Sequence, residues 1–307
     1  MSIKRDRKLV LKEILHGDGP PYWRQGKANR PCQTSEEAAI ERRKLVKVLR
    51  RHGKQDAMAL SLAEKLNECR PLRRCASGAC PECGRAAQRR FVGKADESAR
   101  LHAVARYDNM MAVTIIPTAP DTSAVVRGSI RAAKYRVLRA LHAAKINTFI
   151  GGVDVSYNET APFIRRDDAA DPSPRRSGRC AHVYVVIPQQ AWFRAEALIR
   201  ALFPRTPDVP RPIKADRFNG DLRAFAYCVK TTFDRRVTIP KHIGKEGRTV
   251  CRNTRDRDLL AWQKVELALH LDEVGLTSRW LLSGIPLMKP KPVSRSHPKS
   301  SNTSHPV

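Results

Sequence analysis

The sequence lacks any apolar run long enough to cross a membrane, and it has few aromatic side chains. A membrane-spanning helix needs about 20 consecutive apolar residues, so we expect no transmembrane helix and no membrane partner. Aromatic residues make up only 6% of the 307 residues, which leaves few stacking platforms for single-stranded RNA. The N-terminal segment carries charges and no uninterrupted apolar stretch, so it does not resemble a secretory signal. The expected compartment is therefore the cytoplasm.

The chain is also short of acidic residues. It contains 58 Lys plus Arg against 30 Asp plus Glu, which gives a formal net charge of +28 at pH 7. Such a charge repels itself in a compact fold unless a polyanion neutralises it. Neutralised phosphates supply most of the non-specific affinity for nucleic acid. DNA, single- or double-stranded, is the partner that we predict, while a solvated basic surface and an anionic membrane surface are the alternatives.

Local patterns divide the chain into elements of an α+β protein. Hydrophobic residues reach 41%, enough to form a core. Thr34 to Glu37 has the pattern of a capping box that starts a helix. The spacing of apolar residues predicts helices over 35–51, 55–68, 121–146, 189–203 and 219–233, one or two more within 257–283, and strands over 110–116, 149–157, 180–187 and 211–215. This order is typical of a ferredoxin-like antiparallel sheet of the βαββαβ type, with helices packed on one face.

Composition also suggests a division into regions. We predict a basic helical N-terminal region over residues 1–68, a cysteine zinc knuckle and linker over 69–107, a larger α+β domain over 108–285 and a disordered basic tail over 286–307.

Four cysteines fall close together between the N-terminal region and the larger domain. Eight cysteines in a cytoplasmic chain are more typical of thiols or metal ligands than of disulfides. The pair Cys80 and Cys83 has the two-residue gap that lets both thiolates turn onto one cation. A closed structural zinc site needs four ligands, so Cys75 and either Cys69 or Cys32 would complete it. Reduced, unliganded thiols and a redox dithiol are the competing interpretations.

A second constellation lies in the larger domain. On the predicted strand over 180–187, His182 and Tyr184 share a face because side chains alternate, and Asp154 on the neighbouring strand could face His182. A histidine and a carboxylate on one face could bind Mg²⁺ or Mn²⁺. Tyr227 and Lys230 are three residues apart on a predicted helix and so share a side of it. A tyrosine beside a metal could attack a DNA phosphate and retain it as an ester.

Each residue of this second constellation has a plainer interpretation. A tyrosine and a lysine three apart on a helix often only pack and face solvent, a strand histidine is often just a satisfied polar group, and Asp154 could cap a loop or form an ion pair.

Taken in order, these segments resemble a known family. The chain is similar to plasmid replication initiators of the rolling-circle, His-hydrophobic-His endonuclease group over roughly residues 69–235. The segments that carry the resemblance are Cys75–Cys83, Ala112–Pro117, Gly152–Asn158, Cys180–Val186 and Ala226–Lys230. The last of these resembles the family's Lys-Tyr-x-x-Lys nucleophile motif. Tyr184 stands where the family has its second metal-binding histidine, and Asp154 stands where it has a glutamate.

The resemblance implies a function and a set of roles. Tyr227 would be the nucleophile that forms a 5′-phosphotyrosine link, assisted by Lys230, with His182 and Asp154 as ligands of the catalytic metal. The partners would be a replication origin and a host helicase. Two alternatives remain: a non-catalytic, zinc-containing DNA-binding protein on the same scaffold, and a basic RNA-binding protein.

Overall fold

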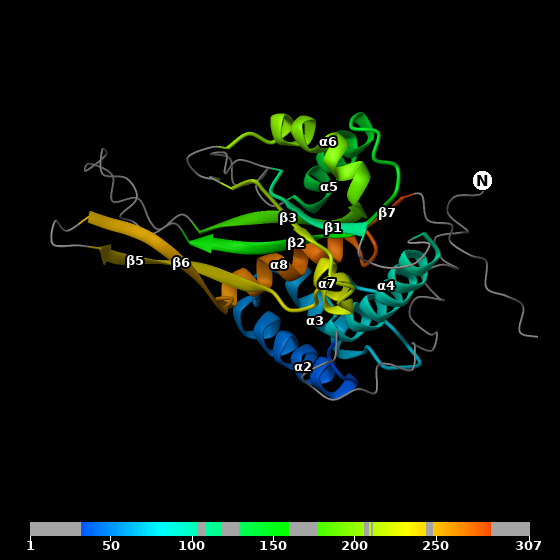
Figure 1. Ribbon diagram of the computed structural model, residues 1–307. Coiled ribbons are helices and arrows are strands. Elements are labelled where there is room, and N and C mark those ends of the chain that lie inside the picture. The colour runs from blue at the N-terminus through cyan, green and yellow to red at the C-terminus, as the bar shows by residue number, and fades with distance from the viewer. Residues whose placement is uncertain are drawn as a thin grey trace, which may run out of the picture.

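The computed structural model describes residues 32–102, 109–117, 129–159, 177–205, 209, 211–243 and 248–283. Within these residues, seven helices surround one sheet (Figure 1). The helices are α2 (Ser35–His52), α3 (Ala57–Asn67), α4 (Pro81–His102), α5 (Ile130–Ala143), α6 (Gln189–Leu202), α7 (Leu222–Cys228) and α8 (Ala261–Val274). The strands are β1 (Met110–Ile115), β2 (Phe149–Glu159), β3 (Ser177–Pro188), β4 (Ile213–Arg217), β5 (Asp234–Ile243), β6 (Arg248–Asp258) and β7 (Trp280–Ser283). None of these helices is long and apolar enough to cross a membrane.

The sheet is mixed, with the order β4-β1-β3-β2-β5-β6 and β7 paired to β2. Along the segment β4-β1-β3-β2, each pair of neighbouring strands is antiparallel. The outer edge of β2 is shared: β7 pairs with it antiparallel from Phe149 to Gly152, and β5 pairs with it parallel from Tyr157 to Glu159. The prediction of a wholly antiparallel sheet is therefore wrong at this edge, because the chain returns to β2 twice after β4.

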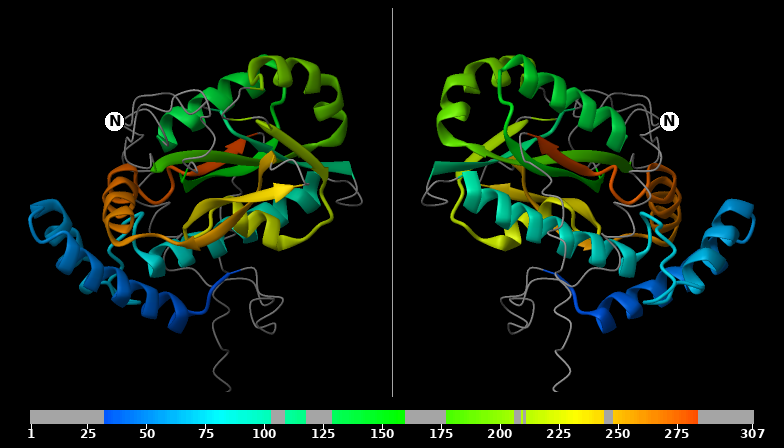
Figure 2. Two further views of the ribbon diagram at one scale, coloured as in Figure 1. Left: turned by 90° about the vertical axis from the view of Figure 1, so that its left-hand side faces the viewer. Right: turned by 90° about the vertical axis from the view of Figure 1, so that its right-hand side faces the viewer.

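Helices cover both faces of the sheet (Figures 1 and 2). Helices α5 and α6 lie on one face, where alternate residues such as Val153 and Val183 join the main core cluster. Helices α4 and α7 lie on the other, where Ile150 and Val186 pack with Phe91 and Phe225. The βαββαβ pattern predicts helices on one face only, so the face that carries Asp154 and His182 is more enclosed than predicted.

The N-terminal helices begin where their capping residues predict. The Thr34 side chain accepts a hydrogen bond from the Glu37 amide, and the Glu37 carboxylate accepts one from the Thr34 amide, which confirms the capping box. Asp56 caps α3 in the same way through the amides of Met58 and Ala59. Buried apolar residues of both helices belong to the main core cluster, so these helices pack onto the rest of the described chain.

Several predicted elements differ from the structure. Residues 81–102, which the sequence analysis placed in a knuckle and linker, form α4. The helical interpretation of 257–283 holds only for α8, because Gly275 with φ +82° ends that helix and residues 280–283 form β7. The hairpin of β5 and β6 was not predicted, and it projects away from the helices in Figure 1. The predictions for residues 1–31 and 284–307 lie outside the described residues.

Gly152 allows α7 to lie close to the sheet. A Cβ built on it would overlap the carbonyl oxygen of Cys228, the last residue of α7, and would lie 2.8 Å from Val229 Cγ1. Tyr184 is the register partner of Gly152 on β3. The glycine therefore sets the height of α7 above Tyr184.

We expect Gly152→Ala to lower the free energy of unfolding by about 1–3 kcal/mol, because the added methyl group must push α7 away from β2. Chemical denaturation measures this change, and Thr232→Ala, an exposed position just beyond α7, is the control. An unchanged stability for Gly152→Ala would contradict this account of how α7 packs.

Candidate functional site

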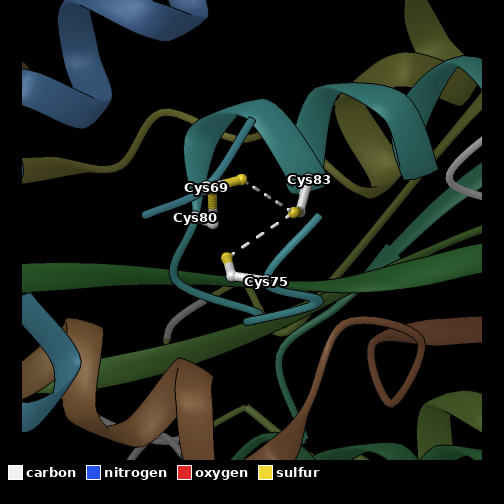
Figure 3. Close-up of side chains that lie close together, drawn as sticks. All are labelled: Cys69, Cys75, Cys80 and Cys83. Atoms are coloured by element: carbon white, nitrogen blue, oxygen red, sulfur yellow. Dashed lines mark hydrogen bonds between the residues drawn. The ribbon is translucent and has the colours of Figure 1, made fainter. Parts of the chain in front are cut away.

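The four clustered cysteines meet at one point (Figure 3). Their sulfur atoms all lie within 4.8 Å of one another. The Sγ atoms of three pairs, Cys69 with Cys83, Cys75 with Cys83 and Cys80 with Cys69, are each 3.7 Å apart. Four thiolates bound to zinc at about 2.3 Å would be about 3.8 Å apart at the corners of a tetrahedron. The donor set therefore fits a structural metal ion such as zinc.

Local backbone structure brings the four sulfurs together. Cys69 directly follows the C-cap of α3, while Cys80 precedes α4 and Cys83 lies in its first turn. Pro81 is the first helical residue, where its missing amide hydrogen costs nothing. The N-terminus of α4 favours the negative charge of thiolates. Hydrogen bonds with the neighbouring cysteines, together with burial, raise the pKa of Cys80 and Cys83, so four thiolates need a cation among them.

Cys32, the alternative fourth ligand, lies elsewhere. It is buried in the cluster of apolar residues around Phe91 and Phe225, and burial raises the pKa of its thiol. Cys69 takes the fourth position in the group instead.

A buried cluster of charged side chains lies beside the cysteines. Glu82 lies between the two knuckle cysteines in sequence. Its carboxylate forms ion pairs with Arg42 Nε at 2.7 Å and with Arg74 Nη1 at 2.9 Å. The Arg42 guanidinium also donates to the carbonyl of Leu66 at 2.8 Å, near the end of α3. Arg42 thus connects α2, α3 and the start of α4, and it positions the loop that carries Cys69.

Helix α4 also contacts α7, which carries Tyr227. The Gln88 side chain donates a hydrogen bond of 2.8 Å from Nε2 to the carbonyl of Ala226, the residue before Tyr227. A Cβ at Gly84 would lie 2.9 Å from Thr231 Cγ2, so α4 packs closely against the segment after α7. Helix α4 therefore connects the four-cysteine group at its N-terminus with the segment that carries Tyr227.

Tyr227 is the exposed member of an aromatic pair. Its side chain is 40% exposed, and its hydroxyl accepts a hydrogen bond of 3.3 Å from the hydroxyl of Tyr184. The two rings meet edge to face with their centroids 4.7 Å apart. The Lys230 ammonium lies 5.4 Å from the centre of the Tyr227 ring. A hydrogen-bond donor and a cation therefore both lie beside Tyr227.

His182 and Asp154 are register partners on β3 and β2, as the alternation of the strands predicts. His182 is only 2% exposed, and its Nε2 lies 3.0 Å from the Ser156 hydroxyl. Burial, together with the positive charges of Arg236 and Lys230, lowers the pKa of His182 to about 3. The imidazole is therefore neutral at physiological pH. Tyr184 stacks on it with ring centroids 6.4 Å apart and separates it from Tyr227.

Asp154 is fully buried between two cations. Its carboxylate lies 3.1 Å from Lys230 Nζ and 3.9 Å from Arg279 Nη2. Burial raises the pKa of this carboxyl group, and the two cations counteract the rise only in part. The Arg279 guanidinium donates at 2.8 Å to the carbonyls of Val153 and Lys230. Arg279 thereby fixes both the strand that carries Asp154 and the backbone of Lys230.

This arrangement does not fit the divalent metal that the resemblance implies. The single negative charge of Asp154 already faces two cations, and a divalent ion beside it would meet their positive charge. The Nε2 atom of His182 contacts Ser156, and Tyr184 supplies a phenol in place of an imidazole. Among the described residues, the four cysteines are the one group of three or more metal-ligand side chains close enough to hold an ion.

The structure brings Tyr227, Lys230, His182 and Asp154 to one side of the sheet, with differences from the predicted arrangement. Lys230 is not on the helix with Tyr227, because α7 ends at Cys228 and a turn carries Lys230 back. The sequence analysis missed Ser156, which alternation places beside Asp154. Gln88 and Arg279 were missed too, because their partners lie 49 to 138 residues away and leave no local pattern.

Purified protein should contain about one zinc ion per chain, and Cys83→Ser should lose most of it, because three thiolates and a hydroxyl bind zinc poorly. Elemental analysis measures the content. Cys32→Ser, a buried cysteine outside the group, should keep the metal. Equal zinc contents in the two variants would refute the assignment.

His182 should make stability depend on pH. Its pKa is lowered on folding, so only the unfolded chain takes up a proton as the pH falls from 6.5 towards 3, and the folded state loses stability there. His182→Gln cannot titrate. Between pH 7.5 and pH 5, the wild type should lose about 2 kcal/mol more unfolding free energy than this variant, at about 1.4 kcal/mol per pH unit. Urea denaturation at both pH values measures the difference, and parallel pH slopes would contradict a buried neutral imidazole.

No family model, curated protein or solved structure matches this chain. The resemblance to replication initiators is therefore an expectation from the ordered sequence motifs alone.

Proposed function

We propose that the protein binds DNA and cleaves one strand by transesterification at Tyr227, in the manner of initiators of rolling-circle replication. The observation that carries the proposal is the exposed Tyr227 hydroxyl, which accepts a hydrogen bond from Tyr184 beside the Lys230 ammonium. The phenol oxygen attacks a backbone phosphate in line and forms a 5′-phosphotyrosine ester. The leaving strand keeps a free 3′-hydroxyl, from which synthesis begins. The retained ester allows a later strand transfer.

The strand order supports the proposed likeness in fold. The segment β4-β1-β3-β2, with α5 and α6 on one face, follows the βαββαβ order of a ferredoxin-like unit. In this proposal the β5–β6 hairpin and the N-terminal helices are additions around that unit, and the metal of the four-cysteine group is zinc.

Cationic residues in two places support binding to DNA. Helix α2 exposes Arg43, Lys47, Arg50 and Arg51, a series with helical spacing that could follow a phosphate backbone. The β5–β6 hairpin is also rich in Arg and Lys by sequence and begins at Asp234, four residues after Lys230. A two-stranded ribbon is narrow enough to enter the major groove. We propose that these elements hold an origin duplex, in the cytoplasm and together with a host helicase.

A non-catalytic DNA-binding protein on the same scaffold is the second candidate. The buried ion cluster of Asp154 with Lys230 and Arg279 favours it, because those side chains stabilise one another without any substrate. This candidate predicts salt-dependent DNA binding with no covalent product.

A covalent adduct decides between the two. Purified protein incubated with Mg²⁺ and supercoiled DNA that carries its own origin should form a protein–DNA adduct that resists denaturant. Tyr227→Phe should lose this adduct at least about 1000-fold, since the phenyl ring retains the packing but has no nucleophile. Gel electrophoresis of labelled DNA measures the yield.

Tyr135→Phe is the matched control, because Tyr135 is an exposed tyrosine on α5, at 62%, and should leave the adduct unchanged. If the wild type binds the origin but forms no adduct on supercoiled or single-stranded origin DNA, the protein is the non-catalytic binder.

A further inference from the structure

The cation held at the tyrosine site is a lysine side chain. Lys230 Nζ lies 3.1 Å from one carboxylate oxygen of Asp154 and 3.7 Å from Asp234, and its side chain is only 13% exposed. A lysine on an open surface would move among many rotamers, whereas two carboxylates hold this one in place. The ammonium therefore has a fixed position next to the ring of Tyr227.

We propose that strand cleavage at Tyr227 needs no divalent metal, and that the Lys230 ammonium, held by Asp154, supplies the positive charge at the reacting phosphate. This inference rests on the proposed function, since it names the group that assists the reaction at the same site. It departs from the metal-dependent chemistry that the resemblance implies.

The charges around Asp154 disfavour a divalent metal ion. A divalent cation needs free anionic or neutral oxygen and nitrogen donors, and the single carboxylate here faces two cations. Displacing Lys230 to admit a metal would leave the metal still within reach of the buried Arg279 guanidinium. The donor set therefore favours the lysine over the ion.

Hydrogen bonds from Arg279 to the backbone hold Lys230 and Asp154 in place. Arg279 donates to the carbonyl of Lys230 at 2.8 Å and to that of Val153, next to Asp154, at 2.8 Å. Arg279 is thus a positioning residue that holds the lysine and its anchor on adjacent segments. The function of Asp154 follows from this geometry: it anchors an ammonium where the family's glutamate would bind a metal.

The hydroxyl groups of Tyr184 and Tyr227 take part in the proposed reaction. Tyr184 donates its hydrogen bond to the Tyr227 oxygen, so it stabilises the charge that develops there as the proton leaves. The Tyr227 oxygen forms a bond to phosphorus while the bond from phosphorus to the 3′ oxygen breaks. That oxygen keeps the electron pair and takes up a proton through solvent in exchange for the one that Tyr227 releases. The step requires no oxidant, reductant or further reactant.

The first experiment measures Mn²⁺ binding to the full-length, zinc-loaded protein by electron paramagnetic resonance of free Mn²⁺. The wild type and Asp154→Asn should give the same binding curve, because Asp154 is not a metal ligand. A stoichiometric Mn²⁺ ion in the wild type whose affinity falls tenfold or more in Asp154→Asn or in His182→Gln would overturn the proposal. This measurement does not depend on cleavage.

The second experiment measures adduct formation with EDTA in place of Mg²⁺, after elemental analysis has verified that the zinc is retained. The rate should stay within about threefold of the rate with Mg²⁺. Lys230→Met should lower it about 100-fold in both buffers, and Lys230→Arg should restore part of it. Lys145→Met, an exposed lysine in the loop after α5, is the control for loss of one positive charge.

The outcomes separate the two proposals. An adduct that forms with Mg²⁺ and falls at least about 100-fold with EDTA overturns the metal-independent site but keeps the nuclease. If no adduct forms in either buffer, the proposed function fails, and the proposal that Lys230 acts in catalysis fails with it. The Mn²⁺ curves then still decide whether Asp154 holds a lysine or a metal.

Discussion

The four-cysteine group at the start of α4 is the constraint on which the rest of the described structure depends. It joins the end of α3 to the first turn of α4, and the Glu82 ion cluster beside it ties α2 to the same point. Helix α4 then extends beneath the sheet and holds α7 through Gln88. A metal bound by these cysteines would fix one end of the helix that supports Tyr227. The four-cysteine group therefore supports the segment that carries Tyr227, although the two are about 145 residues apart in sequence.

The buried carboxylate of Asp154 is the second constraint. An isolated charge in an apolar interior is very unfavourable, so its partners become fixed once the sheet forms. Here the partners come from the turn after α7 and from the residue just before β7, and the Arg279 guanidinium bonds the backbone of both Lys230 and Val153. Removing Lys230, the nearer cation, would leave only Arg279 at 3.9 Å to compensate the carboxylate, and breaking a buried ion pair typically destabilises a protein more than the intact pair stabilises it. The same ion cluster gives Lys230 a defined place.

Much of this could be predicted from local pattern, and the failures have physical causes. Alternation along the strands predicted that Asp154 and His182 face each other, and cysteine spacing predicted the metal group. Alternation shows which residues share a face, but it does not show what covers that face, so α4 was not expected on the face that carries His182. The β5–β6 hairpin has no apolar alternation because it projects beyond the core. The contacts of Arg279 join residues far apart in sequence, which no window of residues can reveal.

The contrast in exposure at the site supports a chemical function for Tyr227. Asp154 and His182 are at most 2% exposed; the Asp154 carboxylate lies beside two cations, and His182 Nε2 contacts the Ser156 hydroxyl. Tyr227 is 40% exposed, although α7 buries its neighbours Ala226 and Cys228. A tyrosine with a purely structural role would bury its ring and satisfy its hydroxyl inside. Here the hydroxyl lies at the surface, a buried framework holds the Tyr184 hydroxyl against it, and the Lys230 ammonium lies beside the ring. Such preorganisation is what a nucleophile requires, because the supporting groups need not move when charge develops on its oxygen.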